Sequence, residues 1–228
     1  MKLSNETLEV LSNFTNINDN LVIDPAEDGA THTLIRTKNV ASNVFAEYNA
    51  PEVFPVPISI YNLSEFLSVI RLFDAPDLDF GEKYLTISDE SSSNKVRYFY
   101  ADRSILSYPE KGIKFPESDV TVTLGTKDFA KIKKAAATLG LPNVSVLGDG
   151  SNVTLRAHDT GKQSGNFFDL SLEAQTNSDD AFQVDFTTDT LDLLPVEYSL
   201  DLNFKGISRF SNAGYGLTYY IAMRVQAG

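Results

Sequence analysis

The sequence predicts an α+β protein of two similar domains, each an antiparallel sheet with helices on one face. Short segments in which apolar and polar residues alternate are typical of half-buried strands. Longer segments with apolar residues at helical spacing are typical of amphipathic helices. The same order of segments occurs twice within the 228 residues, which indicates a duplicated domain.

Each copy opens with a short strand and an amphipathic helix. The first helix has Leu8 and Leu11 on its apolar side, and Ser4 or Asn5 can cap its start. A strand is predicted just before it, at residues 2–4. Three further strands are predicted at 21–23, 31–36 and 44–48.

The second copy repeats this plan further along the chain. Phe129 and Ile132 stand 121 positions after Leu8 and Leu11, and Thr126 can cap the helix that contains them. The matching strands are predicted at 120–124, 144–146, 152–156 and 167–172.

The later part of each copy also matches. A strand at 54–58 corresponds to one at 182–186, and each leads into a short helix. Asn62 and Glu65 can form a capping box at the first of these helices. Pro195 restricts the second to a brief or kinked helix. Hairpins close the two copies and end at 95–101 and 218–225.

Two prolines and a glycine between the copies predict an extended linker. We therefore predict an N-terminal domain at 1–107, a connector at 108–118 and a C-terminal domain at 119–228. Each copy then has about 110 residues, which is a common size for a domain.

Composition narrows the classes of function. The chain has no cysteine, which excludes disulfides, thiol nucleophiles and thiolate metal sites. The N-terminus lacks the apolar core of a secretion signal, and no apolar run approaches the roughly 20 residues of a membrane-spanning helix. We expect a soluble, intracellular, globular protein. Its formal net charge of -12 argues against a surface that coats nucleic acid but allows a local basic stripe.

Signatures of catalysis are scarce. The chain has no complete dinucleotide-binding loop or P-loop, and His32 and His158 are each isolated from a second metal ligand. The acidic segment 74–82 is out of register for a calcium loop and is predicted to be a solvated turn. We predict no catalytic residue, no metal site and no cofactor. A hydrolase with paired carboxylates is a remote alternative.

The helix that contains Phe129 concentrates positive charge. Lys127, Lys131 and Lys134 lie within about 60° of one another at roughly 100° per residue, with Lys133 on the flank. Lysines are common on the solvated side of amphipathic helices, but these are four of only 19 basic residues in an acidic chain. A row of amines without base-reading side chains suits phosphates of any sequence.

Three features of the sequence resemble those of a known protein family. The opening MKLS, the NFTNIN at 13–18 and the duplicated layout resemble the DNA polymerase sliding clamps of T-even-like tailed bacteriophages. The resemblance covers essentially the whole chain. It implies the DNA clamp fold, in which three two-domain subunits form a closed ring around duplex DNA with helices lining the hole. It also implies a processivity factor that is not an enzyme and acts in the cytoplasm of the infected bacterial host.

The same resemblance implies partners and site residues. Such a clamp encloses double-stranded DNA regardless of sequence, is loaded by an ATP-dependent clamp loader complex and binds the C-terminal peptide of the DNA polymerase. It can also serve late transcription. The implied DNA-facing residues are Lys127, Lys131, Lys134, Lys133, Arg71 and Lys2. The implied groove for partner peptides comprises Ile113, Phe115, Pro116, Tyr108 and Met223. Anchoring of the connector onto the domain cores is the alternative interpretation of these five residues.

Two of the four predicted helices depart from a basic lining. The first carries Glu6 and Glu9, and the one near Thr188 carries Asp189 and Asp192. A trimer would carry 3 × -12 = -36 charges, so closure of the ring rather than attraction has to hold the DNA. We expect the basic helices to compensate locally. The alternative function is a β-rich oligomeric structural protein of a phage tail or neck, in which the lysine row would be an intersubunit contact.

Overall fold

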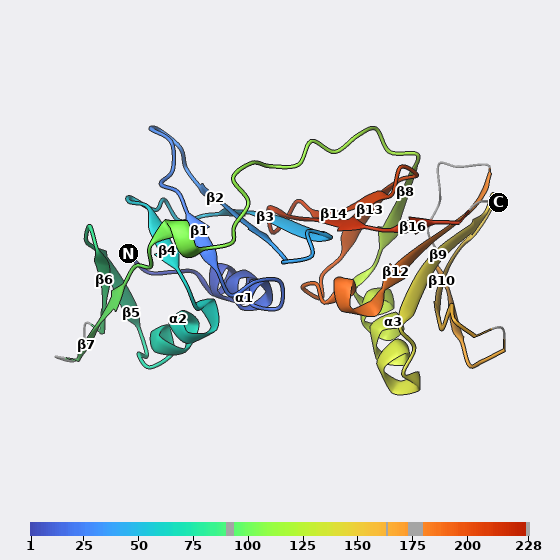
Figure 1. Ribbon diagram of the computed structural model, residues 1–228, viewed down its shortest axis with the longest axis horizontal. Coiled ribbons are helices and arrows are strands. Elements are labelled where there is room, and N and C mark those ends of the chain that lie inside the picture. Colours follow the sequence, from blue (N-terminus) through green and yellow to red (C-terminus); the bar gives the residue numbers. More distant parts are fainter. Residues whose placement is uncertain (90–93, 163, 173–179, 227–228) are drawn as a thin grey trace. The chain divides into compact units, whose positions relative to one another are not determined.

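The computed structural model describes residues 1–89, 94–162, 164–172 and 180–226 (Figure 1). The chain divides into two compact units. The first comprises Met1–Gly112 with Gly214–Leu217, and the second comprises Ile113–Ala213 with Thr218–Gly228. Each unit combines antiparallel strands with helices.

The first unit contains two groups of antiparallel strands. One group has the order β4-β1-β2-β3 and the other has the order β5-β6-β7. Buried residues recur at every second position of β2, as expected of a strand with one face in the core. The strands are β1 (Leu21–Ile23), β2 (Thr33–Lys38), β3 (Val44–Ala50), β4 (Ile58–Ile60), β5 (Pro76–Phe80), β6 (Tyr84–Asp89) and β7 (Lys95–Phe99).

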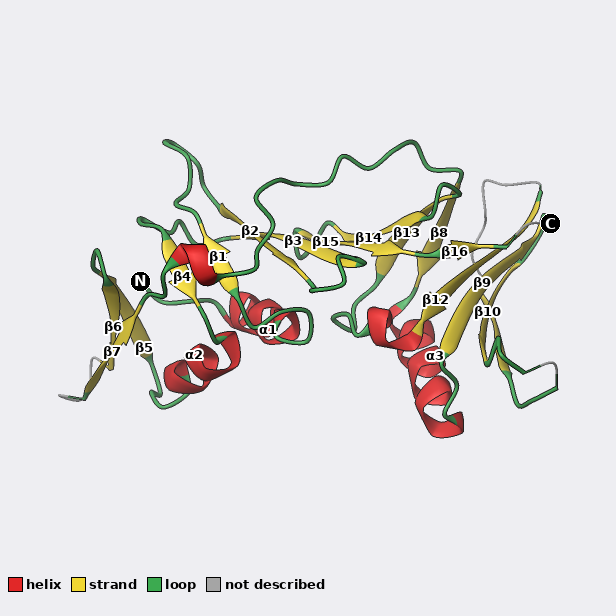
Figure 2. Ribbon diagram, viewed as in Figure 1, coloured by secondary structure: helices red, strands yellow, loops and turns green. Residues whose placement is uncertain are grey.

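Two α-helices, α1 (Asn5–Phe14) and α2 (Leu63–Ile70), contact each other in the first unit (Figure 2). The side chain of Ser4 caps α1 and that of Asn62 caps α2, each by accepting a hydrogen bond from an amide of the first turn. Ser4 and Asn62 are thus confirmed as N-caps; of the capping box predicted at α2, the structure shows the bond from the Glu65 amide to Asn62. A single 3-10 turn, η1 (Arg103–Ile105), precedes the connector.

The second unit also contains two groups of antiparallel strands. The order is β15-β14-β13-β8 in one and β11-β10-β9-β12-β16 in the other. In the described residues, no helix is long and apolar enough to cross a bilayer. The strands are β8 (Val120–Leu124), β9 (Asn143–Asp149), β10 (Val153–His158), β11 (Phe168–Leu172), β12 (Ala181–Thr187), β13 (Tyr198–Asn203), β14 (Ile207–Asn212), β15 (Leu217–Ala222) and β16 (Arg224–Val225).

The helix α3 (Thr126–Leu139) packs against β9, β10 and β11 (Figure 1). Its buried residues are Phe129, Ile132 and Ala136, which confirms the apolar side that helical spacing predicted. The Phe129 ring meets the ring of Tyr198 in β13 edge-on, with centroids 5.9 Å apart. The helix therefore joins both strand groups of this unit in one core.

Two predicted elements are shorter than the sequence pattern indicated. The strand predicted at 54–58 is wrong, because β4 begins only at Ile58. Pro55 and Pro57 have no N–H to donate to a strand ladder, which accounts for the late start. The helix predicted near Leu191 is one 3-10 turn, η2 (Thr188–Leu191), as the nearby proline restricted it to be.

Three local predictions are also corrected. Residues 2–4 form no strand. The ammonium group of Met1 lies 2.7 Å from Asp77 Oδ1, and the Met1 carbonyl accepts a hydrogen bond from the Leu78 amide. The segment 74–82 is not a turn, because β5 occupies most of it and pairs with β6. Gly125, not Thr126, stands at the N-cap of α3.

Candidate nucleic-acid interface

The exposed side of α3 carries the lysine row. Lys127, Lys131 and Lys134 are exposed, whereas Phe129 and Ile132 are each only 1% exposed. The buried residues stand at i, i+3 and i+7, so one side of the helix is apolar and packs against the sheet, while the amines on the other side are left in solvent. The structure thus brings the three lysines together on one exposed face.

The four lysines of α3 differ in their contacts. Lys133 Nζ lies 2.9 Å from Asp192 Oδ1, beyond η2, so its charge is neutralised locally. Lys131 Nζ lies 5.9 Å from the ring centroid of Phe168 in β11. Within the described part of the chain, Lys127 and Lys134 form no ion pair. Three cations of this face therefore remain available to an anionic ligand.

The other predicted DNA-facing residues lie in the first unit. Arg71 follows the last residue of α2, is exposed, and donates from Nη2 to Ser12 Oγ of α1 at 3.2 Å. Lys2 is exposed in the segment before α1. Neither shares an element with the α3 row.

The helix α1 is acidic and its carboxylates are hydrogen-bonded by tyrosines. The hydroxyl of Tyr48 donates to Glu6 at 3.1 Å, and that of Tyr215 donates to Glu9 at 3.4 Å. Burial, together with the neighbouring carboxylates, raises the pKa of Tyr48, so this hydroxyl stays protonated and keeps donating. The sequence could not indicate these pairs, because the partners lie far apart along the chain.

Residues 106–119 contain no helix or strand, as expected of the predicted connector. Ile113, Phe115 and Pro116 are half-buried, and the Phe115 ring lies 6.1 Å from the ring of Tyr220 between centroids. Met223 is buried, with 7% of its surface exposed. Phe115 therefore packs on the second unit, and Ile113 and Pro116 are partly shielded from solvent.

Tyr108 belongs to the first unit and has an anchoring contact there. Its hydroxyl accepts a hydrogen bond from Arg103 Nε at 2.7 Å, and the same guanidinium binds Asp24 with two hydrogen bonds. The Arg103 guanidinium also lies 4.8 Å from the centre of the Tyr108 ring. This geometry favours anchoring, the alternative that the sequence left open for Tyr108.

Arg209 is a connector contact that the sequence did not single out. Its guanidinium carbon lies 4.7 Å from the centre of the Phe115 ring, and its Nε and Nη2 both donate to Asp201 Oδ2, at 2.9 and 2.7 Å. The sequence signal for this contact was Gly206, a residue that can turn a hairpin. In the structure the hairpin turns there, with a φ of 101° at Gly206, and pairs Asp201 with Arg209.

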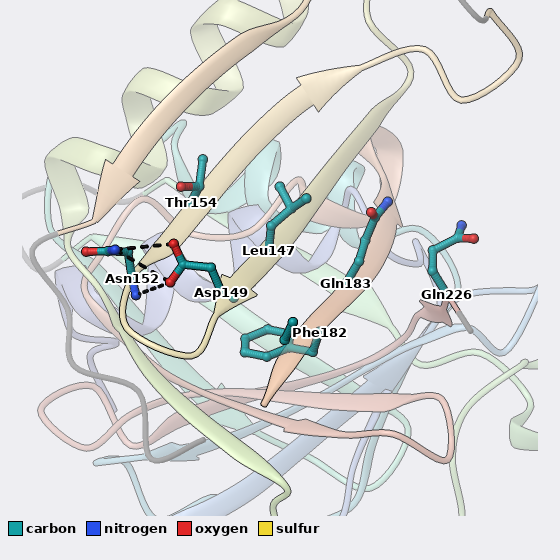
Figure 3. A pocket seen from close by; sticks show the side chains of 9 residues that line it. Leu147, Asp149, Asn152, Thr154, Phe182, Gln183 and Gln226 are labelled. Atoms are coloured by element: carbon teal, nitrogen blue, oxygen red, sulfur yellow. Dashed lines mark hydrogen bonds between the residues drawn. The ribbon is translucent and has the colours of Figure 1, made fainter. Parts of the chain in front are cut away.

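A cavity of about 390 Å³ opens in the second unit at the strands β9, β10 and β12 (Figure 3). Its carboxylate, Asp149, turns toward Asn152 of its own hairpin and accepts hydrogen bonds from the Ser151 and Asn152 amides. These hydrogen bonds lower the pKa of Asp149. Its carboxylate therefore stays ionised, and its oxygens are engaged in stabilising the turn. In the described residues, no three His, Asp or Glu side chains are grouped as a metal site.

The comparison with known proteins decides the family. The chain is 31% identical over 227 residues to the sliding clamp of Vibrio phage KVP40, covering 97% of this chain and 98% of that one. The chain belongs to the sliding clamp family. The sliding clamp of Escherichia phage RB69 is 25% identical over 167 residues, covering 72% of this chain and 70% of that one. The sliding clamp of Enterobacteria phage T4 is 26% identical over 148 residues, covering 64% and 61%.

Solved structures agree on the fold of this sliding clamp. The proliferating cellular nuclear antigen of Entamoeba histolytica matches with a TM-score of 0.72 at 17% identity, covering 98% of this chain and 97% of that one. The A. fulgidus PCNA bound to the C-terminal region of FEN-1 matches with a TM-score of 0.76 at 15% identity, covering 99% and 98%. No family model matches the chain. The predicted α+β clamp fold is confirmed, and the relatives do not favour a tail or neck protein.

Proposed function

We propose that this sliding clamp encircles duplex DNA as a homotrimeric ring and tethers the replicative DNA polymerase for processive synthesis. The observation that carries the proposal is the row of three exposed lysines on α3, which form no ion pair with any residue that the structure describes, in a chain of this family. The function is tethering rather than catalysis, and no cofactor takes part in it.

The lysine row suits contacts that allow DNA to slide. Lys127, Lys131 and Lys134 offer point charges without side chains that read bases, so they attract phosphates of every sequence equally. Three such contacts bind duplex weakly at physiological salt. Retention then depends on the closed ring, and the acidic charge elsewhere repels DNA from other surfaces.

We propose two clamp domains at 1–107 and 119–228, joined by the connector at 108–118. Two sheet edges support assembly into a ring. β7 ends the order β5-β6-β7, and β11 ends the order of the five-stranded sheet. Phe99 at the end of β7 is 67% exposed, and Phe167, which immediately precedes β11, is 59% exposed. Unpaired edges of this kind accept a strand from a second copy.

The partners of the ring are proposed from the family and the connector. A structural relative carries a peptide of FEN-1, which supports peptide recognition by this fold. We assign the C-terminal peptide of the DNA polymerase to a groove beside Ile113, Phe115, Pro116 and Met223. An ATP-dependent clamp loader complex opens the ring, and late transcription in the infected bacterium is a further use.

The lysine row gives the sharpest test of DNA contact. Replacing Lys127, Lys131 and Lys134 together with alanine is expected to shorten the DNA-bound lifetime. The dependence of log affinity on log salt is expected to flatten by about 2.7 for each subunit in contact, because each lost phosphate contact removes about 0.9. Loading assays at several salt concentrations measure both quantities.

Lys133→Ala is the matched control. It removes a charge from the same helix, but one that Asp192 already neutralises. We expect it to change the lifetime much less than any one of the other three. The native mass of the triple variant is expected to remain that of the trimer. Loss of the trimer in the triple variant would instead assign the lysines to an interface between subunits.

A further inference from the structure

A polar row crosses the outer face of the sheet in the second unit. Thr121, Asp201 and Arg209 are neighbours across β8, β13 and β14. Val120, Val122 and Leu200, which point the other way, are in the core. Thr121 Oγ1 donates to Asp201 Oδ1 at 2.7 Å, while Arg209 occupies Asp201 Oδ2 with two hydrogen bonds. The carboxylate is therefore bonded on both oxygens.

Asp201 is buried although it lies on the face opposite the core. Only 5% of its surface is exposed. Arg209 lies against it, and the Phe115 ring of the connector stacks on the Arg209 guanidinium at 4.7 Å. The connector is thus seated on an arginine that a buried carboxylate holds in place.

The first unit holds the connector in a similar way. Arg36 of β2 and Glu47 of β3 are cross-strand partners, and Arg36 Nε lies 2.8 Å from Glu47 Oε1. The backbone of Gly112 rests directly on this pair, because a Cβ at Gly112 would lie 2.6 Å from Glu47 Oε1 and 3.3 Å from Arg36 Nη2. An arginine–carboxylate pair therefore supports the connector at Gly112 and another supports it at Phe115.

We propose that these two pairs are positioning devices that set the course of the connector and thereby the affinity of the partner peptide. The inference rests on the proposed function and names residues that act through the connector, chiefly Arg209. A loop that is ordered before binding loses less conformational freedom when an extended apolar peptide lies against it. Without these pairs, Ile113 and Phe115 would become ordered only when the peptide binds, and that loss of conformational freedom would lower the affinity.

The test uses the trimeric clamp and a synthetic peptide with the C-terminal residues of the cognate DNA polymerase. In Arg209→Met the peptide is expected to bind on the order of tenfold more weakly, since the connector must then be ordered on binding. Amide hydrogen exchange at 108–118 is expected to accelerate, while the native mass matches that of Lys162→Met. The melting temperature is expected to fall below that of Lys162→Met, because the buried Asp201 carboxylate loses its counter-charge. That control removes one charge and one ion pair, with Asp159, from the same unit.

Two further variants separate positioning from a general loss of structure. In a Phe115→Leu background, Arg209→Met is expected to add little, because the arginine acts through that ring. Gly112→Ala is expected to weaken peptide binding as well, because its methyl group displaces the end of the Glu47 side chain while leaving the sheet intact.

The outcomes distinguish this inference from the proposed function. If the unmodified clamp binds the peptide and Arg209→Met binds it as well as Lys162→Met does, the positioning role is wrong and the peptide partner stands. If the unmodified clamp does not bind the peptide at all, both the partner and the positioning role are wrong.

Discussion

At the scale of single residues, Asp185 shows how a buried charge is kept in this clamp. It is 4% exposed, and its carboxylate accepts hydrogen bonds from Ser145, Gln183 and Gln226. Burial disfavours the ionised form, but the hydrogen bonds together outweigh it and lower the pKa of Asp185. The carboxylate thereby joins β9, β12 and the residue that follows β16.

Asp185→Asn is expected to lower the free energy of unfolding at pH 7 by about 1–3 kcal/mol, because the amide cannot accept the same three bonds. A carboxylate with a lowered pKa stabilises the fold above its unfolded pKa of about 3.9, and this contribution is lost as the pH falls through the folded pKa. Urea unfolding of both proteins at pH 7 and near pH 3 measures it. A difference between them that does not shrink in acid would contradict this role.

The sequence predicted which single residues are exposed wherever exposure depends on helical periodicity, as it does for Lys127 and Lys131. Ion pairs did not follow, because they depend on tertiary packing or on register. Lys133 meets Asp192 across 59 positions, which no local pattern encodes. Arg209 meets Asp201 across eight positions, and only the turn at Gly206 sets that register.

At the scale of elements, α3 depends on a left-handed residue at its end. Gly140 has a φ of 62°, and its backbone N–H donates to Ala137 O at 3.3 Å. Glycine adopts this conformation without the steric cost that a Cβ brings. The left-handed conformation of Gly140, rather than side-chain packing, therefore ends the helix that carries the lysine row.

Gly140→Ala is expected to destabilise the clamp by about 1 kcal/mol, the cost of a Cβ in the left-handed region. Nothing lies within 4 Å of the position a Cβ would take, so crowding does not contribute. Gly140→Asn is the matched variant and is expected to cost less, because asparagine tolerates this region. Chemical denaturation compares them, and equal losses would point to a cause other than backbone conformation.

The elements themselves were largely predictable, and their ends were less so. Period-3.6 and period-2 patterns located α1, α2, α3 and most strands, because burial of one face is a local property. The late start of β4 traces to prolines that cannot donate to a strand ladder, whereas the brevity of η2 was predicted from the nearby proline. Residues 2–4 form no strand, and the ammonium group of Met1 before them forms a tertiary ion pair that no local pattern encodes.

At the scale of the whole molecule, the duplicated order of segments predicted two similar parts. The sequence could not show which sheet edges would remain unpaired, because an edge is a property of the completed sheet. Among the strands that the structure describes, β7 and β11 are such edges. The ring was predicted from the family resemblance, because the repeat alone is compatible with other oligomers.

Phe99→Lys at the β7 edge is expected to shift the assembly from trimer toward monomer. A charge in place of the exposed ring discourages strand addition and removes apolar area from the proposed interface. Native mass spectrometry over a dilution series measures the shift. Val40→Lys, at an exposed turn between β2 and β3, is the control for charge addition. A Phe99→Lys protein as trimeric as the control would remove this edge from the interface.

Tethering by enclosure is the central claim, and retention on DNA of different topology tests it most directly. The clamp is supplied with its loader complex and ATP on circular and on linear duplex of the same sequence, and the bound fraction is followed over time at moderate salt. We predict long retention on the circle and rapid loss from the free ends of the linear form. Equal retention on both forms, or on neither, would contradict the claim.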